Sequence, residues 1–351
     1  MVNGWQRPGL GVAAFFMYTA RIKKLFLPAE RIPMSTLTLT TIQTNLHWED
    51  KPANLRMLEE KIMGIQEKTE IVVLPEMFNT GFTMQPEKLA ETMEGETVAW
   101  MKRVAMEKRV VLLGSFACDT GNATYTNRLV WMLPNGQFGY YDKRHLFAFA
   151  GEDQHYTAGN KRLIASVKGW KINLQVCYDL RFPVWARNRS FAPFSADASK
   201  GAQDDNIEYD VLIYVANWPE RRSHAWKTLL VARAIENQSY VIGVNRVGND
   251  GNAIFHSGDS MVIDPLGELL YTNKDVEDIH TITLDKTQLN AVREKLPFLR
   301  DGDAFSIEHF QCSTFSKYPF HPALLQVVHY KIKAFLFIAY QFRGKYAFLF
   351  K

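Results

Sequence analysis

Apolar residues follow two alternating patterns along the chain between residues 34 and 306. One pattern repeats them every three or four positions, as in Leu55, Leu58, Ile62 and Ile65, which is typical of an amphipathic helix. The other is a short apolar run or a strict apolar–polar alternation, which is typical of a strand. The predicted helices cover 53–66, 97–108 and 225–237, and the predicted strands cover 36–46, 70–75, 110–117, 170–177, 211–216 and 240–247.

Turn-forming sequences separate several of these elements. A hairpin is predicted across Pro134-Asn135-Gly136, a second turn at Asn249-Asp250-Gly251, and a split between the last two strands at 264–267. Helices interleaved with strands and hairpins predict a layered α/β domain with mixed sheets. Residues 190–207 are polar and are interpreted as a surface loop.

The two ends of the chain differ from its middle. Residues 1–33 lack a clear period, and Met34 directly precedes the first predicted strand, so 1–33 is interpreted as a poorly ordered extension. Residues 307–351 are aromatic and basic, with no acidic residue after Glu308. A membrane-surface or partner-binding helix is one interpretation of this tail. A poorly packed tail is favoured, because its charges do not gather on one helical face.

Composition narrows the class of protein. With 47% hydrophobic and 22% charged residues, the chain has the composition of a globular protein. The net charge of +4 is small and resides mainly in the two ends, so no nucleic-acid groove is indicated. No apolar run is long enough to cross a bilayer. The apolar stretch 9–20 is short for a signal peptide and has no clear cleavage site, so we expect a cytoplasmic protein.

Three predicted strands end in a reactive polar residue. Glu76 follows Leu74-Pro75, Lys143 follows Tyr141-Asp142, and Cys177 ends the run 170–177. Sites on layered α/β folds gather at strand ends, where side chains leave the core. Each residue also has a structural interpretation: a glutamate that reaches solvent, a surface lysine, or a buried inert cysteine.

The three cysteines are Cys118, Cys177 and Cys312, an odd number without metal-ligand spacing, which favours a reducing compartment. Cys118 and Cys312 are interpreted as inert. Cys177 stands between a strand and the helix-forming stretch 183–187, as in a nucleophile elbow, where the backbone N–H of Tyr178 could join an oxyanion hole.

A set of Glu76, Lys143 and Cys177 could act without a histidine. The carboxylate would take the thiol proton, and the ammonium would stabilise developing negative charge. His145 and His155 are accordingly interpreted as structural residues.

These segments, together with 214–219, 232–237 and 243–248, resemble the nitrilase (carbon–nitrogen hydrolase) superfamily and its omega-amidase branch, over about residues 34–306. The resemblance implies a four-layer α-β-β-α sandwich and a homodimer. It implies a catalytic triad on Glu76, Lys143 and Cys177, with a second glutamate on Glu152, seven positions before Gly159. It also places Arg181, four residues after the nucleophile, near a substrate carboxylate.

The function expected from this resemblance is release of ammonia from a small carboxylate-bearing amide such as 2-oxoglutaramate or 2-oxosuccinamate, through a cysteine thioester. No metal or organic cofactor is expected. A nitrilase or another carbon–nitrogen hydrolase with the same triad is an alternative, because the differences lie in pocket walls. An alternative of another class is a non-catalytic membrane-surface or partner-binding protein that uses its C-terminal tail.

Overall fold

The computed structural model describes residues 36–188 and 207–303, together with residues 305 and 307. The predicted extension 1–33, nearly all of the polar loop 190–207, and the C-terminal tail beyond residue 307 lie outside the described residues. Cys312 lies there too.

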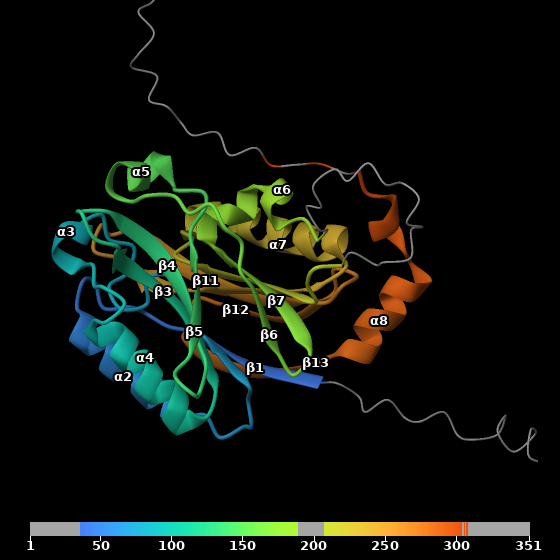
Figure 1. Cartoon of the computed structure of the whole chain (residues 1–351), viewed down its shortest axis with the longest axis horizontal. Coiled ribbons are helices and arrows are strands. Elements are labelled where there is room, and N and C mark those ends of the chain that lie inside the picture. Colours follow the sequence, from blue (N-terminus) through green and yellow to red (C-terminus); the bar gives the residue numbers. More distant parts are fainter. Residues whose placement is uncertain (1–35, 189–206, 304, 306, 308–351) are drawn as a thin grey trace, which may run out of the picture. The chain divides into compact units, whose positions relative to one another are not determined.

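Strands and helices alternate through the described chain (Figure 1). The strands are β1 (Thr36–Gln43), β2 (Ile71–Val73), β3 (Val111–Asp119), β4 (Tyr125–Met132), β5 (Phe138–Asp142), β6 (Ile164–Val167), β7 (Trp170–Val176), β8 (Val211–Ala216), β9 (Tyr240–Asn245), β10 (Val247–Asn249), β11 (Phe255–Ile263), β12 (Leu269–Lys274) and β13 (Asp278–Asp285). The α-helices are α2 (Lys51–Met63), α3 (Pro86–Leu89), α4 (Glu96–Lys108), α5 (Glu152–His155), α6 (Pro183–Ala186), α7 (Ser223–Asn237) and α8 (Lys286–Lys295). Short 3-10 helices are η1 (Ala148–Ala150), η2 (Cys177–Arg181), η3 (Glu220–Arg222) and η4 (Phe298–Asp301).

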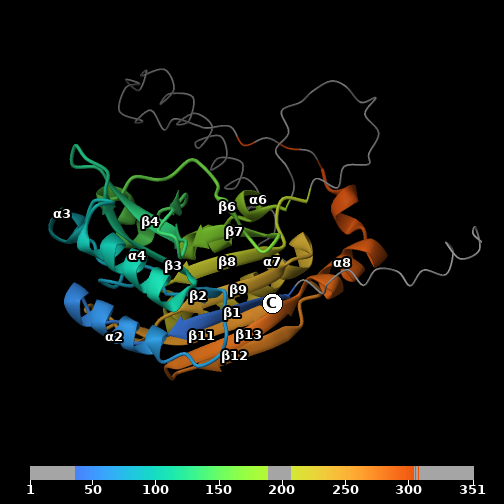
Figure 2. The ribbon, with the colours of Figure 1, turned by 60° about the horizontal axis from the view of Figure 1, so that its bottom comes forward.

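Two mixed sheets form the centre of the fold. The first has the order β13-β1-β2-β3-β4-β5, and the second β10-β11-β9-β8-β7-β6, with β12 paired to β11. β1, β2 and β3 run parallel, as do β7, β8 and β9, while the outer strands pair antiparallel. Helices α2 and α4 cover the first sheet and α7 covers the second (Figure 2). The predicted α-β-β-α sandwich is confirmed.

Local sequence explains the helical layer on the first sheet. Helix α2 begins where Asp50 accepts a hydrogen bond from the Ala53 amide at 3.0 Å, which satisfies one of the free amides of the first turn. Its apolar face buries Leu55, Leu58 and Ile62. These side chains join α4 and the first sheet in one core, which gives the marginally amphipathic helix its tertiary support.

Predicted and observed elements differ mainly at their ends. The strand predicted over 240–247 is two strands, because β9 pairs with β8 only as far as Asn245, whereas β10 pairs with β11. The helix-forming stretch 183–187 makes only the one turn of α6. None of the helices in the described ranges has both the length and the apolar character needed to cross a membrane.

The packing of the buried face of α2 can be tested by mutation. Leu58 is fully buried in the core, so its truncation in Leu58→Ala should lower the free energy of unfolding by about 3 kcal/mol, from lost transfer energy and the cavity left behind. Met106→Ala, at an exposed position of α4, should change it by less than about 0.5 kcal/mol. Urea unfolding of both variants measures the difference, and equal losses would show that α2 is not packed as described.

Candidate active site

Four of the residues singled out in the sequence lie at the ends of strands or in the connections that follow. Glu76 comes three residues after β2, Lys143 directly after β5, Cys177 directly after β7, and Glu152 begins α5. The side chains of Glu76, Lys143 and Glu152 have no exposed surface, whereas Cys177 is 9% exposed. Only the cysteine of this group therefore reaches solvent.

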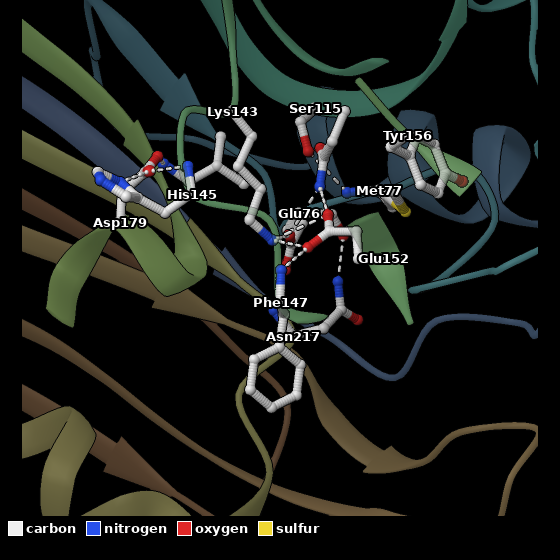
Figure 3. Close-up of polar contacts among 12 residues, drawn as sticks. Glu76, Met77, Ser115, Lys143, His145, Phe147, Glu152, Tyr156, Asp179 and Asn217 are labelled. Carbon is white, nitrogen blue, oxygen red and sulfur yellow. Dashed lines mark hydrogen bonds and ion pairs between the residues drawn. The ribbon is translucent and has the colours of Figure 1, made fainter. Parts of the chain in front are cut away.

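Lys143 lies between the two glutamates (Figure 3). Its Nζ is 2.9 Å from Glu76 Oε1 and 2.8 Å from Glu152 Oε2. Asn127 Nδ2 donates to both carboxylates as well, at 2.8 Å to Glu76 and 3.1 Å to Glu152. Two carboxylates thus share one ammonium and one amide group, which satisfies charges that burial alone would make very costly.

Backbone amides hold each glutamate from the other side. The Asn217 amide donates to Glu76 Oε2 at 2.8 Å, and the Phe147 amide donates to Glu152 Oε2 at 2.6 Å. The Asn217 side chain also donates to the Glu76 carbonyl at 2.6 Å. Ser115 Oγ accepts from the amide of Met77, whose φ of 44° turns the chain sharply after Glu76. The carboxylates are therefore fixed in place without a substrate.

The buried charges alter one another's proton affinity. Burial by itself would lower the pKa of Lys143, but the Glu152 and Glu76 carboxylates outweigh it, so the pKa is raised and the ammonium persists. Burial raises the pKa of Glu152, and Glu76 adds to this, although Lys143 opposes both. Burial raises the pKa of the Cys177 thiol well above its ordinary value of 9.0, and Glu76 raises it further, while Lys143 lowers it. These shifts favour the thiol form of Cys177 over the thiolate.

Cys177 stands on a sharp turn. Its φ of 45° lies in the left-handed region, which is uncommon for a residue with a side chain and marks a strained site. β7 ends at Val176 and η2 begins at Cys177, so the Tyr178 amide falls in a first helical turn, where amides lack an intrahelical acceptor. This is the strand-to-helix geometry expected of an elbow.

Asp179 ties the elbow to the segment that carries Lys143. Its Oδ2 accepts from the Val176 amide at 3.0 Å and from the Tyr141 hydroxyl at 2.7 Å. Its Oδ1 lies 2.9 Å from the His145 amide and 2.8 Å from His145 Nδ1 (Figure 3). Because Tyr141 and His145 flank Lys143 by two residues on each side, this one buried carboxylate sets the position of the lysine segment relative to Cys177.

Gly159 has a steric reason to be glycine. A Cβ atom there would lie 2.1 Å from the Asp142 carbonyl oxygen, well inside van der Waals contact. The Gly159 amide donates to the Lys143 carbonyl at 2.9 Å, so the chain after α5 lies directly against the Lys143 backbone. The segment from Glu152 to Gly159 therefore contacts Lys143 at both ends, through the Glu152 carboxylate and the Gly159 amide.

A cavity of about 240 Å³ opens beside the cysteine. Its wall is mainly apolar, with several aromatic rings and with arginines at three points: Phe82, Phe147, Phe149, Ala150, Cys177, Tyr178, Arg181, Asn217, Trp218, Pro219, Arg221, Arg222, Asp250, Ile254 and His256. The predicted residues Arg181 and Tyr178 thus lie on the same cavity as Cys177. Its size suits a small ligand.

Comparison with known proteins agrees with this geometry. The family model described as carbon-nitrogen hydrolase matches residues 38–294. The chain belongs to the carbon–nitrogen hydrolase family. It is 42% identical over 279 residues to omega-amidase YafV of Escherichia coli (strain K12), covering 78% of this chain and 100% of that protein.

Two further relatives of this carbon–nitrogen hydrolase are informative. The 2-oxoglutaramate amidase of Bacillus subtilis (strain 168) is 29% identical over 266 residues, which is 75% of this chain and 96% of that one. The crystal structure of XC1258 from Xanthomonas campestris, a CN-hydrolase superfamily protein with an arsenic adduct in the active site, is 40% identical with a TM-score of 0.73. That match covers 78% of this chain and 100% of XC1258. The predicted family is confirmed.

The remaining predicted residues have defined surroundings. His145 stacks on Phe182, with ring centroids 3.8 Å apart, and pairs with Asp179. His155 faces Glu87 at 3.5 Å. Cys118 is fully buried in β3, and burial raises its pKa to about 11. These three lie outside the cavity lining.

Sequence reasoning missed Asn127, Asn217 and Asp179. Asn217 lies in the segment 214–219, which carries part of the family resemblance, and Asp179 comes two residues after Cys177. Asparagine and aspartate are common in the loops that follow strands, so neither residue drew attention. Asn127 lies inside β4, where its neighbours suggest only a strand. Their roles depend on which groups the fold brings beside them.

Replacing Asp179 tests its positioning role. Asp179→Asn removes one of two acceptor oxygens, so at least one of its four donors loses its partner and the Lys143 segment shifts relative to Cys177. We expect amidase kcat/KM to fall about 100-fold, with slower alkylation of Cys177 by iodoacetamide. Asp153→Asn, at an exposed position of α5, is the control. Unchanged alkylation and turnover in Asp179→Asn would contradict the role.

The charges around Cys177 predict a pH dependence with a definite sign. Because the pKa of Cys177 is raised, its thiolate fraction grows with pH, and alkylation should still be rising at pH 9.0. Glu76→Gln removes a charge that raises this pKa, so the profile should move to lower pH. Lys143→Met removes a charge that lowers it, so the profile should move to higher pH. Mass spectrometry of the Cys177 peptide separates this signal from Cys118, and shifts in the same direction would refute the arrangement.

Proposed function

We propose that this carbon–nitrogen hydrolase is an omega-amidase that releases ammonia from a small amide bearing a carboxylate, such as 2-oxoglutaramate or 2-oxosuccinamate. One observation carries the proposal: a buried Glu76–Lys143–Glu152 cluster lies near Cys177, at a small cavity whose lining includes three arginines. Relatives named omega-amidase and 2-oxoglutaramate amidase support the same reaction.

The first half of the reaction forms a thioester. Glu76 removes the proton from Cys177, and the thiolate attacks the amide carbonyl carbon. The carbonyl oxygen becomes an oxyanion, which Lys143 Nζ and the Tyr178 amide stabilise. Glu76 returns its proton to the amide nitrogen, the carbon–nitrogen bond breaks, and ammonia leaves. The raised pKa of the thiol is the reason that a base is needed.

The second half hydrolyses the thioester. Glu76 takes a proton from a water molecule that Glu152 helps to position, and the hydroxide attacks the thioester carbon. The carbon–sulfur bond breaks, the acid leaves, and the proton on Glu76 returns to sulfur. Lys143, fixed by both glutamates, lies beside the oxyanion in both halves. The charges need little rearrangement between steps, which favours electrostatic stabilisation of both transition states.

The arginines of the cavity are suited to attract the carboxylate of the substrate. Arg181 lines the cavity at the end of η2, with its guanidinium carbon 5.1 Å from the centroid of the Trp218 ring. An arginine on a mainly apolar cavity wall favours an anionic end on the substrate. We propose that Arg181 attracts this carboxylate, and that a neutral nitrile or amide of equal size would be a poorer substrate.

The organisation of the whole protein is also proposed. Residues 34–306 form the catalytic unit, within which the family match falls. The protein acts in the cytoplasm as a homodimer, as the superfamily resemblance implies. Light scattering of the full chain after size-exclusion chromatography tests the dimer, and a monomer mass would reject it.

Loss of the nucleophile gives the direct test of function. Cys177→Ala and Glu76→Gln should each lower ammonia release from 2-oxoglutaramate by at least about 1000-fold, because each removes a group that every turnover needs. Cys118→Ala, at the other cysteine in the described ranges, should retain activity within about threefold. Circular dichroism checks that the variants fold. Wild-type turnover of a simple nitrile faster than of any ω-amide would reject the omega-amidase proposal.

A further inference from the structure

The cavity beside Cys177 carries an excess of positive charge. Its lining includes Arg181, Arg221 and Arg222, but Asp250 as its one acidic residue. Oδ1 of Asp250 accepts from the amides of Asn252 and Ile254 at 2.8 and 2.9 Å, so this carboxylate helps to hold its own turn. His256 adds no charge near neutral pH, since burial first, and then Arg246, lower its pKa to about 4.

The three arginines differ in their surroundings. Arg181 and Arg221 are exposed, whereas Arg222 is half-buried. Burial lowers the pKa of Arg222, Arg221 and Arg181 lower it further, and the nearby Cys177 sulfur, when charged, raises it. The charge of Arg222 is therefore costly in the free protein. An anion bound beside it would relieve that cost.

The backbone holds Arg222 in place. The Arg222 amide donates to the Pro219 carbonyl at 3.0 Å, and Trp218 Nε1 donates to the Arg222 carbonyl at 2.8 Å. The guanidinium carbon lies 5.0 Å from the centroid of the Phe147 ring. The Phe147 amide in turn donates to Glu152. Arg222 thus lies over a residue whose amide holds Glu152, and stacking orders the arginine side chain before a ligand arrives.

Within the described ranges, no carboxylate lies within ion-pair distance of Arg222, Arg181 or Arg221. Other arginines beside the second sheet are neutralised: Arg162 pairs with Glu208, and Arg293 with Asp210. A half-buried guanidinium without such a partner, on the wall of a reactive cavity, is suited to a planar anion bound through two hydrogen bonds.

We infer that Arg222, and not Arg181, makes the direct ion pair with the carboxylate of the substrate, while Arg181 acts from the rim. The inference rests on the proposed omega-amidase function and assigns its specificity. In 2-oxoglutaramate the carboxylate carbon is four carbon–carbon bonds from the amide carbon. Cys177 and Arg222 both line the same small cavity, so one would meet the amide end and the other the carboxylate end of such a molecule.

The test compares two substrates of the same shape. In 4-oxopentanamide a methyl group replaces the carboxylate of 2-oxoglutaramate, and the amide is unchanged. The measured quantity is the ratio of kcat/KM for 2-oxoglutaramate to kcat/KM for 4-oxopentanamide. Arg222→Met should lower this ratio about 100-fold, as truncation of a buried charge pair does. Arg222→Lys should lower it less, since the charge remains but the two-pronged geometry is lost.

Two variants distinguish a direct ion pair between Arg222 and the carboxylate from a general electrostatic effect of nearby charges. Arg181→Met should lower the ratio less than about tenfold, with a loss that shrinks in high salt, because an exposed charge is screened. Glu220→Gln changes an exposed charge two residues from Arg222, outside the cavity lining, and should leave the ratio within about twofold. A larger loss in Arg181→Met than in Arg222→Met would overturn the assignment.

The outcomes also separate this inference from the proposed function. Wild-type protein that hydrolyses 2-oxoglutaramate, with a ratio that survives in Arg222→Met, rejects the role of Arg222 alone. Wild-type protein that hydrolyses 4-oxopentanamide but not 2-oxoglutaramate rejects the omega-amidase proposal and this inference with it.

Discussion

A buried lysine between two buried glutamates is the interaction on which the site depends. An ammonium without exposed surface is stable only where carboxylates surround it, and each of these carboxylates needs donors of its own. Asn127, Asn217 and the Phe147 amide supply them. The cluster therefore assembles only when β4, the end of β8 and the loop before α5 meet. The fold must be complete before this charged cluster forms.

The sandwich provides this meeting point at the junction of its two sheets. Glu76 and Lys143 come from strands of the first sheet, while Cys177 and Asn217 follow strands of the second. Asp179 and Asn217 cross between the two sets, one to the Lys143 segment and the other to Glu76. The same contacts that join the sheets thus set the position of Cys177 relative to Glu76 and Lys143. The contacts that stabilise the fold are therefore the contacts that set the geometry of the site.

Several features could be predicted from the sequence because they depend on local spacing. The apolar face of α2 and the continuous apolar runs of β2 and β8 identify their elements, as only buried strands are apolar on both faces. The alternation of apolar and polar residues identifies β7. Glu76, Lys143 and Cys177 stood out because each is a reactive group at the end of a predicted strand. Pairing was less predictable: β13 joins β1, over two hundred residues earlier, through contacts that no local pattern encodes.

The sequence by itself determined the elements, the α/β class and the residues able to do chemistry, because periodicity and strand ends are properties of short segments. Only the tertiary structure decided that Asn127 bridges the glutamates and that Asp179 links the elbow to the segment that carries Lys143. It also decided that Arg222 is the least exposed of the three cavity arginines. Those roles follow from burial and from partners distant in the chain. The pKa values and the charge balance of the site depend on such neighbouring residues, which come together only when the two sheets pack.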